Sequence, residues 1–182
     1  IGDLKINNGK GILLANGDLL INNSDLKPHT ADSAIFLRTS SGIFRTLLIY
    51  NSTLLNISKS PDYFDTSPSD RINLTIKDTR IDSYIIVLAA NNGTIENNKF
   101  NITGAGTLTI SGNNNTIKNN DFSNASIKVK GQENELTNNT IIGTGESNIP
   151  FAISDLDALT NFKNQYHNNT ITNYKRGIST FC

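Results

Sequence analysis

The stretch Ile95-Glu96-Asn97-Asn98-Lys99-Phe100 decides the fold, because its pattern returns along the chain. The pattern is an apolar residue, any residue, Asn or Asp, then Asn, Ser or Thr, any residue, and a second apolar residue. Its copies begin at Ile21, Ile49, Ile76, Ile95, Ile117, Leu136 and Tyr166. Successive copies are separated by 28, 27, 19, 22, 19 and 30 residues. A repeat of this period predicts a solenoid, in which each copy buries its apolar side against its neighbours.

Between the motifs, apolar and polar residues alternate, as in Leu108-Thr109-Ile110 and Ile127-Lys128-Val129-Lys130. A period of two predicts β-strands rather than helices. A leucine-rich repeat has a similar period, but it needs denser Leu and a recurring helix, which this chain lacks. The sequence therefore predicts an all-β solenoid, and at about 20 to 25 residues per coil it makes about eight coils. One local exception is Ser154 to Leu159, which predicts a short helix with Ser154 as its N-cap.

The third residue of the motif is expected to turn the chain sharply between two strands. Asn and Asp tolerate the left-handed backbone conformation of such turns better than other non-glycine residues. Stacked in register, their side chains are expected to hydrogen-bond from coil to coil as an Asn ladder. The predicted ladder residues are Asn23, Asn51, Asp78, Asn97, Asn119, Asn138 and Asn168.

With these motifs the chain resembles the right-handed parallel β-helix proteins of the pectin-lyase-like superfamily, especially their NosD-like repeats. The best run is residues 91–141, where Gly93, Gly112 and Gly131 are each 19 residues apart. The resemblance extends from about Leu4 to Ile178. It implies a single-stranded right-handed parallel β-helix. It implies no particular activity, because that superfamily includes lyases, hydrolases, epimerases, adhesins and tail spikes.

Composition limits the classes of function. Apolar residues make up 36% of the 182 residues, which suits a thin β-helix core, and the chain holds 28 Asn. The net charge is zero with no basic stripe, which disfavours binding to nucleic acid. No apolar run reaches 18 residues, so no membrane insertion is expected. The lone Cys182 forms no intrachain disulfide. We expect one domain, residues 1–182, from a larger secreted or cell-surface protein, because the chain starts at Ile1 without Met.

Insertions between coils commonly form the binding face of a solenoid. The most charged and aromatic insertion lies between Lys59 and Asp82. Its aromatic side chains are suited to stacking on sugar rings, and its charged ones to hydrogen-bonding hydroxyl groups. The binding candidates are Asp62, Tyr63, Phe64, Asp65, Asp70 and Arg71. Their acids also suggest Ca²⁺, but their spacing matches no calcium loop, so no metal or cofactor is predicted. The alternative is a solvated loop that covers the coils.

Catalytic motifs of polygalacturonase-like hydrolases are absent: no Asn-Thr-Asp, Asp-Asp, Gly-His-Gly or Arg-Ile-Lys string occurs. The nearest acid/base arrangement is Asp78, Arg80 and Asp82, which alternate and are expected to face one side. We therefore predict a non-catalytic module for binding or adhesion, to carbohydrate or a partner protein. It is expected to oligomerise or to continue into another domain at the coil ends. The alternatives are a lyase or hydrolase acting on an acidic polysaccharide, and an architectural spacer or pilus or phage-tail component.

Overall fold

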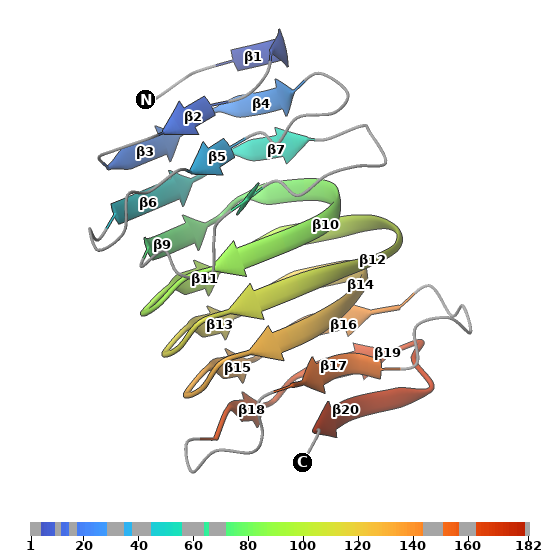
Figure 1. Ribbon diagram of the computed structural model, residues 1–182. Helices are drawn as coiled ribbons and strands as arrows, with labels where there is room; N and C mark the ends of the chain where they lie inside the picture. The colour runs from blue at the N-terminus through green and yellow to red at the C-terminus, as the bar shows by residue number, and fades with distance from the viewer. Residues whose placement is uncertain are drawn as a thin grey trace.

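The computed structural model describes residues 5–9, 12–14, 18–28, 35–37, 45–55, 64–65, 72–143, 151–156 and 163–180. This part of the chain contains β-strands and no helix. A membrane-spanning helix is therefore not found among the described residues. Every strand pairing is parallel. The strands stack in chain order from one end of the molecule to the other (Figure 1). The all-β prediction is confirmed, and the parallel stacking is compatible with a β-solenoid.

The strands form three sheets. The seven-stranded sheet has the order β18 (Gln165–His167), β15 (Glu135–Thr137), β13 (Thr116–Lys118), β11 (Thr94–Glu96), β9 (Ile72–Lys77), β6 (Arg45–Tyr50), β3 (Leu19–Asn22). The ten-stranded sheet follows the path β1 (Lys5–Gly9), β4 (Asp25–Pro28), β7 (Thr53–Leu55), β10 (Arg80–Ala89), β12 (Lys99–Ser111), β14 (Asp121–Lys130), β16 (Thr140–Ile142), β19 (Thr170–Thr172). In that sheet β14 also pairs with β17 (Phe151–Asp155), which pairs with β20 (Arg176–Thr180). The three-stranded sheet is β2 (Ile12–Leu14), β5 (Ile35–Leu37), β8 (Phe64–Asp65).

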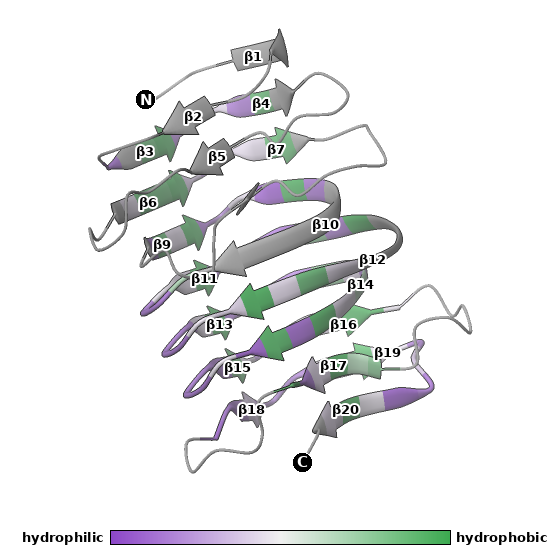
Figure 2. Ribbon diagram, viewed as in Figure 1, coloured by the Kyte–Doolittle hydropathy of each residue, from purple (hydrophilic) through white to green (hydrophobic). Residues whose placement is uncertain are grey.

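The core consists of columns of apolar side chains from successive coils. The first apolar residues of the motif stack as Ile49, Ile76, Ile95, Ile117 and Leu136. The second apolar residues stack as Leu54, Ile81, Phe100, Phe122 and Ile141. The rings of Phe100 and Phe122 lie 4.8 Å apart in a stacked arrangement. Hydrophobic segments alternate with polar ones along these strands (Figure 2). Burial of each such side chain contributes about 1.5–3 kcal/mol.

The left-handed turn predicted for the third motif residue is confirmed. In all copies this residue has a φ between 45° and 56°. Asp78 shares the conformation with a φ of 52°, so the one exception to the Asn series keeps the backbone geometry. The side chains at this position are exposed.

The fourth motif residue, rather than the third, carries the buried contacts between coils. In the last four copies of the motif this fourth residue is an asparagine. We call these four residues the first amide row: Asn98, Asn120, Asn139 and Asn169. Within it, Nδ2 of each residue donates to Oδ1 of the next at 3.0 Å. The predicted ladder named the preceding, exposed residues, where Asn51 Nδ2 donates to Asn23 Oδ1 at 2.5 Å.

A second turn leads back to the seven-stranded sheet and carries a second amide row, which consists of Asn115, Asn134 and Asn164. These residues are linked in the same way, at 2.9 and 3.1 Å. Gly112 and Gly131 begin this turn with φ values of 118° and 122°. A Cβ on Gly131 would lie 2.1 Å from the carbonyl oxygen of Gly112, so glycine is required there.

The helix predicted from Ser154 is wrong over the described residues, because Ser154 and Asp155 belong to strand β17. Ile153 pairs with Ile127, and Asp155 pairs with Val129. Pairing with the preceding coil thus overrides the local helix signal. Residues 157–159 lie outside the described part of the chain.

Candidate functional site

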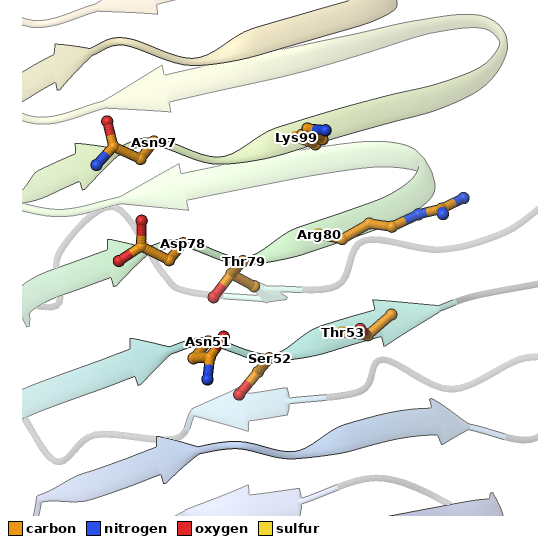
Figure 3. Close-up of a pocket in the computed structure, with 8 residues that line it drawn as sticks. All are labelled: Asn51, Ser52, Thr53, Asp78, Thr79, Arg80, Asn97 and Lys99. Atoms are coloured by element: carbon orange, nitrogen blue, oxygen red, sulfur yellow. The ribbon is translucent and has the colours of Figure 1, made fainter.

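A pocket of about 330 Å³ lies over the motif turns of three successive copies. It is lined by Asn51, Ser52, Thr53, Asp78, Thr79, Arg80, Asn97 and Lys99. These are the third, fourth and fifth residues of the motif, except that the fourth residue of the last copy, Asn98, is not part of the lining. Figure 3 shows the third residues on one side and the fifth residues on the other. The repeat itself therefore builds the pocket.

The floor of the pocket is rigid. Ser52 and Thr79 are buried, and their hydroxyl groups donate to the backbone oxygens of Tyr50 and Lys77 at 2.6 and 2.8 Å. The backbone nitrogen of Thr79 donates to Asn98 Oδ1 at 3.0 Å. Because these hydrogens are already engaged, the floor positions the side chains at the rim instead of donating to a ligand.

One rim consists of Asn51, Asp78 and Asn97, which are exposed on left-handed turns. Their backbone is fixed by hydrogen bonds between coils: Asn51 N donates to Lys77 O at 3.1 Å, and Asp78 N donates to Glu96 O at 3.2 Å. Adjacent parallel strands lie about 4.8 Å apart. The rim therefore offers an amide, a carboxylate and an amide at that spacing.

The other rim includes Arg80 and Lys99, which are register partners on β10 and β12. Arg80 binds the carboxylate of Asp82, with Nη2 2.7 Å from Oδ2, and this hydrogen-bonded acid raises the pKa of Arg80. Its side chain extends away from Asp78 (Figure 3). Lys99 is exposed and has no ion-pair partner among the described residues. Among the described lining residues, Lys99 is therefore the cation that is not already held in an ion pair.

The three residues predicted as an alternative catalytic group, Asp78, Arg80 and Asp82, do not all line the pocket. Asp78 and Arg80 line the pocket, whereas Asp82 is not among the lining residues. Asp78 lies at the bend before β10, and Arg80 and Asp82 lie within the strand. Asp78 is thus the one carboxylate among the described lining residues. Glycoside hydrolysis ordinarily uses two carboxyl groups about 5–9.5 Å apart.

The predicted binding insertion is largely outside the described chain. Asp62, Tyr63, Asp70 and Arg71 are not described, and Phe64 and Asp65 are described only as the backbone of strand β8, which pairs with β5. Their role stays a prediction. Within the ranges that are described, no group of three His, Cys, Asp or Glu side chains is placed to hold a metal ion.

Sequence reasoning missed a buried polar cluster at the C-terminal end. Asp155 accepts hydrogen bonds from Asn164 Nδ2 at 3.1 Å and from the Tyr166 hydroxyl at 2.9 Å. Burial, together with the neighbouring Asp155, raises the pKa of Tyr166. The sequence signal for this cluster was Asp155, which stands two residues after the core residue Ile153 and so faces inward in a strand.

Comparison of the chain with protein-family models, with curated proteins and with solved structures finds no match. The superfamily suggested by the motifs therefore rests on the motifs and on the parallel stacking alone.

Proposed function

We propose that the chain is a right-handed parallel β-helix of about eight coils, related to the pectin-lyase-like superfamily, that serves outside the cell as a non-catalytic binding module. The seven motif copies, their left-handed turns and the in-register parallel sheets support the architecture. The Asn-rich composition and the net charge of zero support the location.

The observation that carries the binding function is the pocket over the motif turns. Its rims present amide, carboxylate, hydroxyl, guanidinium and ammonium groups, all on backbone held by hydrogen bonds between coils. Such groups match the donors and acceptors of carbohydrate hydroxyls. Because the rim repeats along the stack, an extended glycan lying parallel to the stacking direction contacts several coils at once. Preorganised groups lose little conformational entropy on binding.

Substitution by glycine tests this site without disturbing the turn, because glycine adopts a positive φ readily. Asn97→Gly removes a rim amide. Asn119→Gly makes the same change at a turn with the same φ of 56°, outside the pocket lining. We expect affinity electrophoresis in gels cast with a panel of polysaccharides to show retardation by one polymer. Asn97→Gly should weaken that retardation about threefold to tenfold, the effect of about 1 kcal/mol of hydrogen bonding.

Equal retardation of the two variants would place any glycan site elsewhere. Uniform migration across the whole panel would refute carbohydrate binding and favour a protein partner or an architectural spacer. The polymers should then be replaced by candidate surface proteins in the same pairwise comparison.

A second candidate function is cleavage of an acidic polysaccharide, since Asp78 and Arg80 both line the pocket. Asp78→Asn distinguishes the two functions, because Asn occupies the same turn position in the other copies. The variant should abolish turnover if Asp78 is a catalytic base. If the site only binds, it should leave the chain folded and no turnover should be detected in either protein.

A further inference from the structure

Asparagine is often followed two residues later by Ser or Thr in this chain. The 182 residues contain 28 Asn and 35 Ser or Thr. A random order would give about five Asn-x-Ser or Asn-x-Thr triplets with x other than Pro, and the sequence holds ten. Such triplets are the acceptor sequences for N-linked glycans. The structure shows which of them leave the asparagine side chain available to carry a sugar.

Four triplets share one geometry. Their asparagines are exposed and have a φ between 52° and 57°, and the Thr two residues later begins the next strand. Within the described ranges, no hydrogen bond to another protein group engages their Nδ2 atoms. We call these residues the free turn asparagines: Asn92, Asn114, Asn138 and Asn168.

Other triplets have an amide that is already in use. Asn51 stands on the same kind of turn, but its Nδ2 donates to Asn23 Oδ1 at 2.5 Å. Asn124 is half-buried, and its Nδ2 donates to Asn101 Oδ1 at 3.4 Å. A bulky sugar attached at either residue would crowd that contact. Asn51 and Asn124 therefore serve as internal comparisons for the free turn asparagines.

The repeat keeps these triplets away from the buried amide rows. Two residues after a buried asparagine the chain places a core side chain, such as Phe122 after Asn120 and Ile141 after Asn139. An exposed turn asparagine is instead followed two residues later by an outward position of the next strand, which Thr can occupy. A glycan on a free turn asparagine therefore leaves the hydrogen bonds of both amide rows intact.

We propose that the free turn asparagines are sites of N-linked glycosylation. In the reaction, Nδ2 of the asparagine forms a bond to the first sugar of an oligosaccharide carried by a lipid phosphate. The bond between that sugar and the phosphate breaks, the amide gives up one proton, and the lipid phosphate leaves. The proposal rests on the proposed location outside the cell, because N-linked glycans are carried by secreted proteins. It does not rest on the pocket, which none of the four residues lines.

The stack limits how many of these residues carry a glycan at once. The free turn asparagines form two pairs on adjacent coils. In each pair the backbone nitrogen of the first member donates to the oxygen of the residue before the second member at 3.0 Å. Adjacent coils are about 4.8 Å apart, which leaves little room for two bulky oligosaccharides side by side. We therefore expect one glycan in each pair, the pairs being Asn92 with Asn114 and Asn138 with Asn168.

Glycopeptide mass spectrometry tests the proposal on protein recovered from the surface or the medium of the cells that make it. Peptides that contain the free turn asparagines should carry sugar, and those that contain Asn51 or Asn124 should not. Thr140→Val together with Thr170→Val removes both triplets of one pair and should abolish its glycan. Val keeps the branched shape that suits a strand. Thr140→Ser together with Thr170→Ser is the matched control, because it keeps both triplets and should keep the glycan.

Circular dichroism should show that both double variants keep the strand content of the wild type. If the valine variant does not fold, the map of the wild-type protein decides alone. Free turn asparagines without sugar, in protein recovered outside the cell, would overturn the proposal and leave the proposed location standing. Recovery from inside the cell alone, without sugar, would overturn both. Glycans on Asn51 and Asn124 as often as on the free turn asparagines would also overturn the proposal, since the geometry would then select nothing.

Discussion

Neighbouring asparagines in one motif are expected to differ sharply in their effect on stability. Asn119 is exposed at a φ of 56°, and Asn120 is fully buried in the first amide row. Replacing each by Ala and by Gly separates a backbone role from a side-chain role. Ala lacks both the amide and the tolerance of a left-handed backbone, and Gly lacks only the amide.

The magnitudes follow from the contacts of each residue. The Asn120 side chain accepts from the backbone nitrogen and Nδ2 of Asn98 at 2.9 and 3.0 Å. It donates to Ile95 O and Asn139 Oδ1 at 2.9 and 3.0 Å. At about 1 kcal/mol for each buried hydrogen bond, Asn120→Ala should lower the free energy of unfolding by about 4 kcal/mol. Asn119→Ala should lower it by about 1 kcal/mol, the cost of a left-handed alanine.

Equilibrium unfolding in urea measures both effects, with the slope checked for constancy. Asn119→Gly should be close to neutral, because glycine keeps the turn. Asn120→Gly should be at least as damaging as Asn120→Ala, because no backbone requirement compensates the lost amide. The reasoning fails if Asn119→Ala is the costlier alanine variant, or if glycine restores stability at Asn120.

Further predictions concern the second turn and two titrating groups. Gly131→Ala should prevent folding of the stack, which circular dichroism would show, because its Cβ would lie 2.1 Å from a carbonyl oxygen of the preceding coil. Hydrogen bonds and charge from Lys77 and Lys118 lower the pKa of Glu96 below 4.5, so its stabilisation is present above that pH and is lost as the pH falls through the lowered value. Urea midpoints of Glu96→Gln should therefore fall below wild type at pH 7 and converge with it in acid. Burial raises the pKa of Tyr174 to about 12, so its contribution is complete below pH 10 and disappears as the pH rises through 12. Tyr174→Phe should remove that part of the alkaline loss of stability, and an unchanged profile would contradict the assignment.

Local pattern was sufficient for the parts of the fold that each coil makes by itself. Alternation placed residues such as Ile110 and Ile127 in the core, and turn chemistry assigned the left-handed residue, including Asp78. It was harder to predict from the sequence which of the two adjacent asparagines points inward, because both have the same side chain. The first copies hold a signal: Ser24, Ser52 and Thr79 stand at the fourth position, and they are small side chains with an oxygen acceptor.

Features that depend on pairing between distant residues were not predictable from local pattern. Arg80 and Lys99 are neighbours only because β10 and β12 pair in that register. Asp155 carries a helix signal, but its pairing with Val129 places it in a strand. A single sequence shows the motif clearly. It does not show how the strands on either side of an insertion pair in register when the insertions differ in length. The pocket and the amide row of the second turn therefore required the structure.

The second amide row also affects how the protein ages chemically. Asn92-Gly93 is the kind of dipeptide that deamidates fastest in unfolded peptides, because the glycine nitrogen attacks the asparagine side chain. In the fold, that nitrogen is buried and donates to Asn115 Oδ1 at 2.8 Å, although Asn92 itself is exposed. The nitrogen is thus held away from the reaction. Mass spectrometry should find far less isoaspartate at this site in native protein than in urea, and equal amounts would show that the nitrogen is free. The hydrogen bond that aligns these two coils is thus expected to slow deamidation at this Asn-Gly pair.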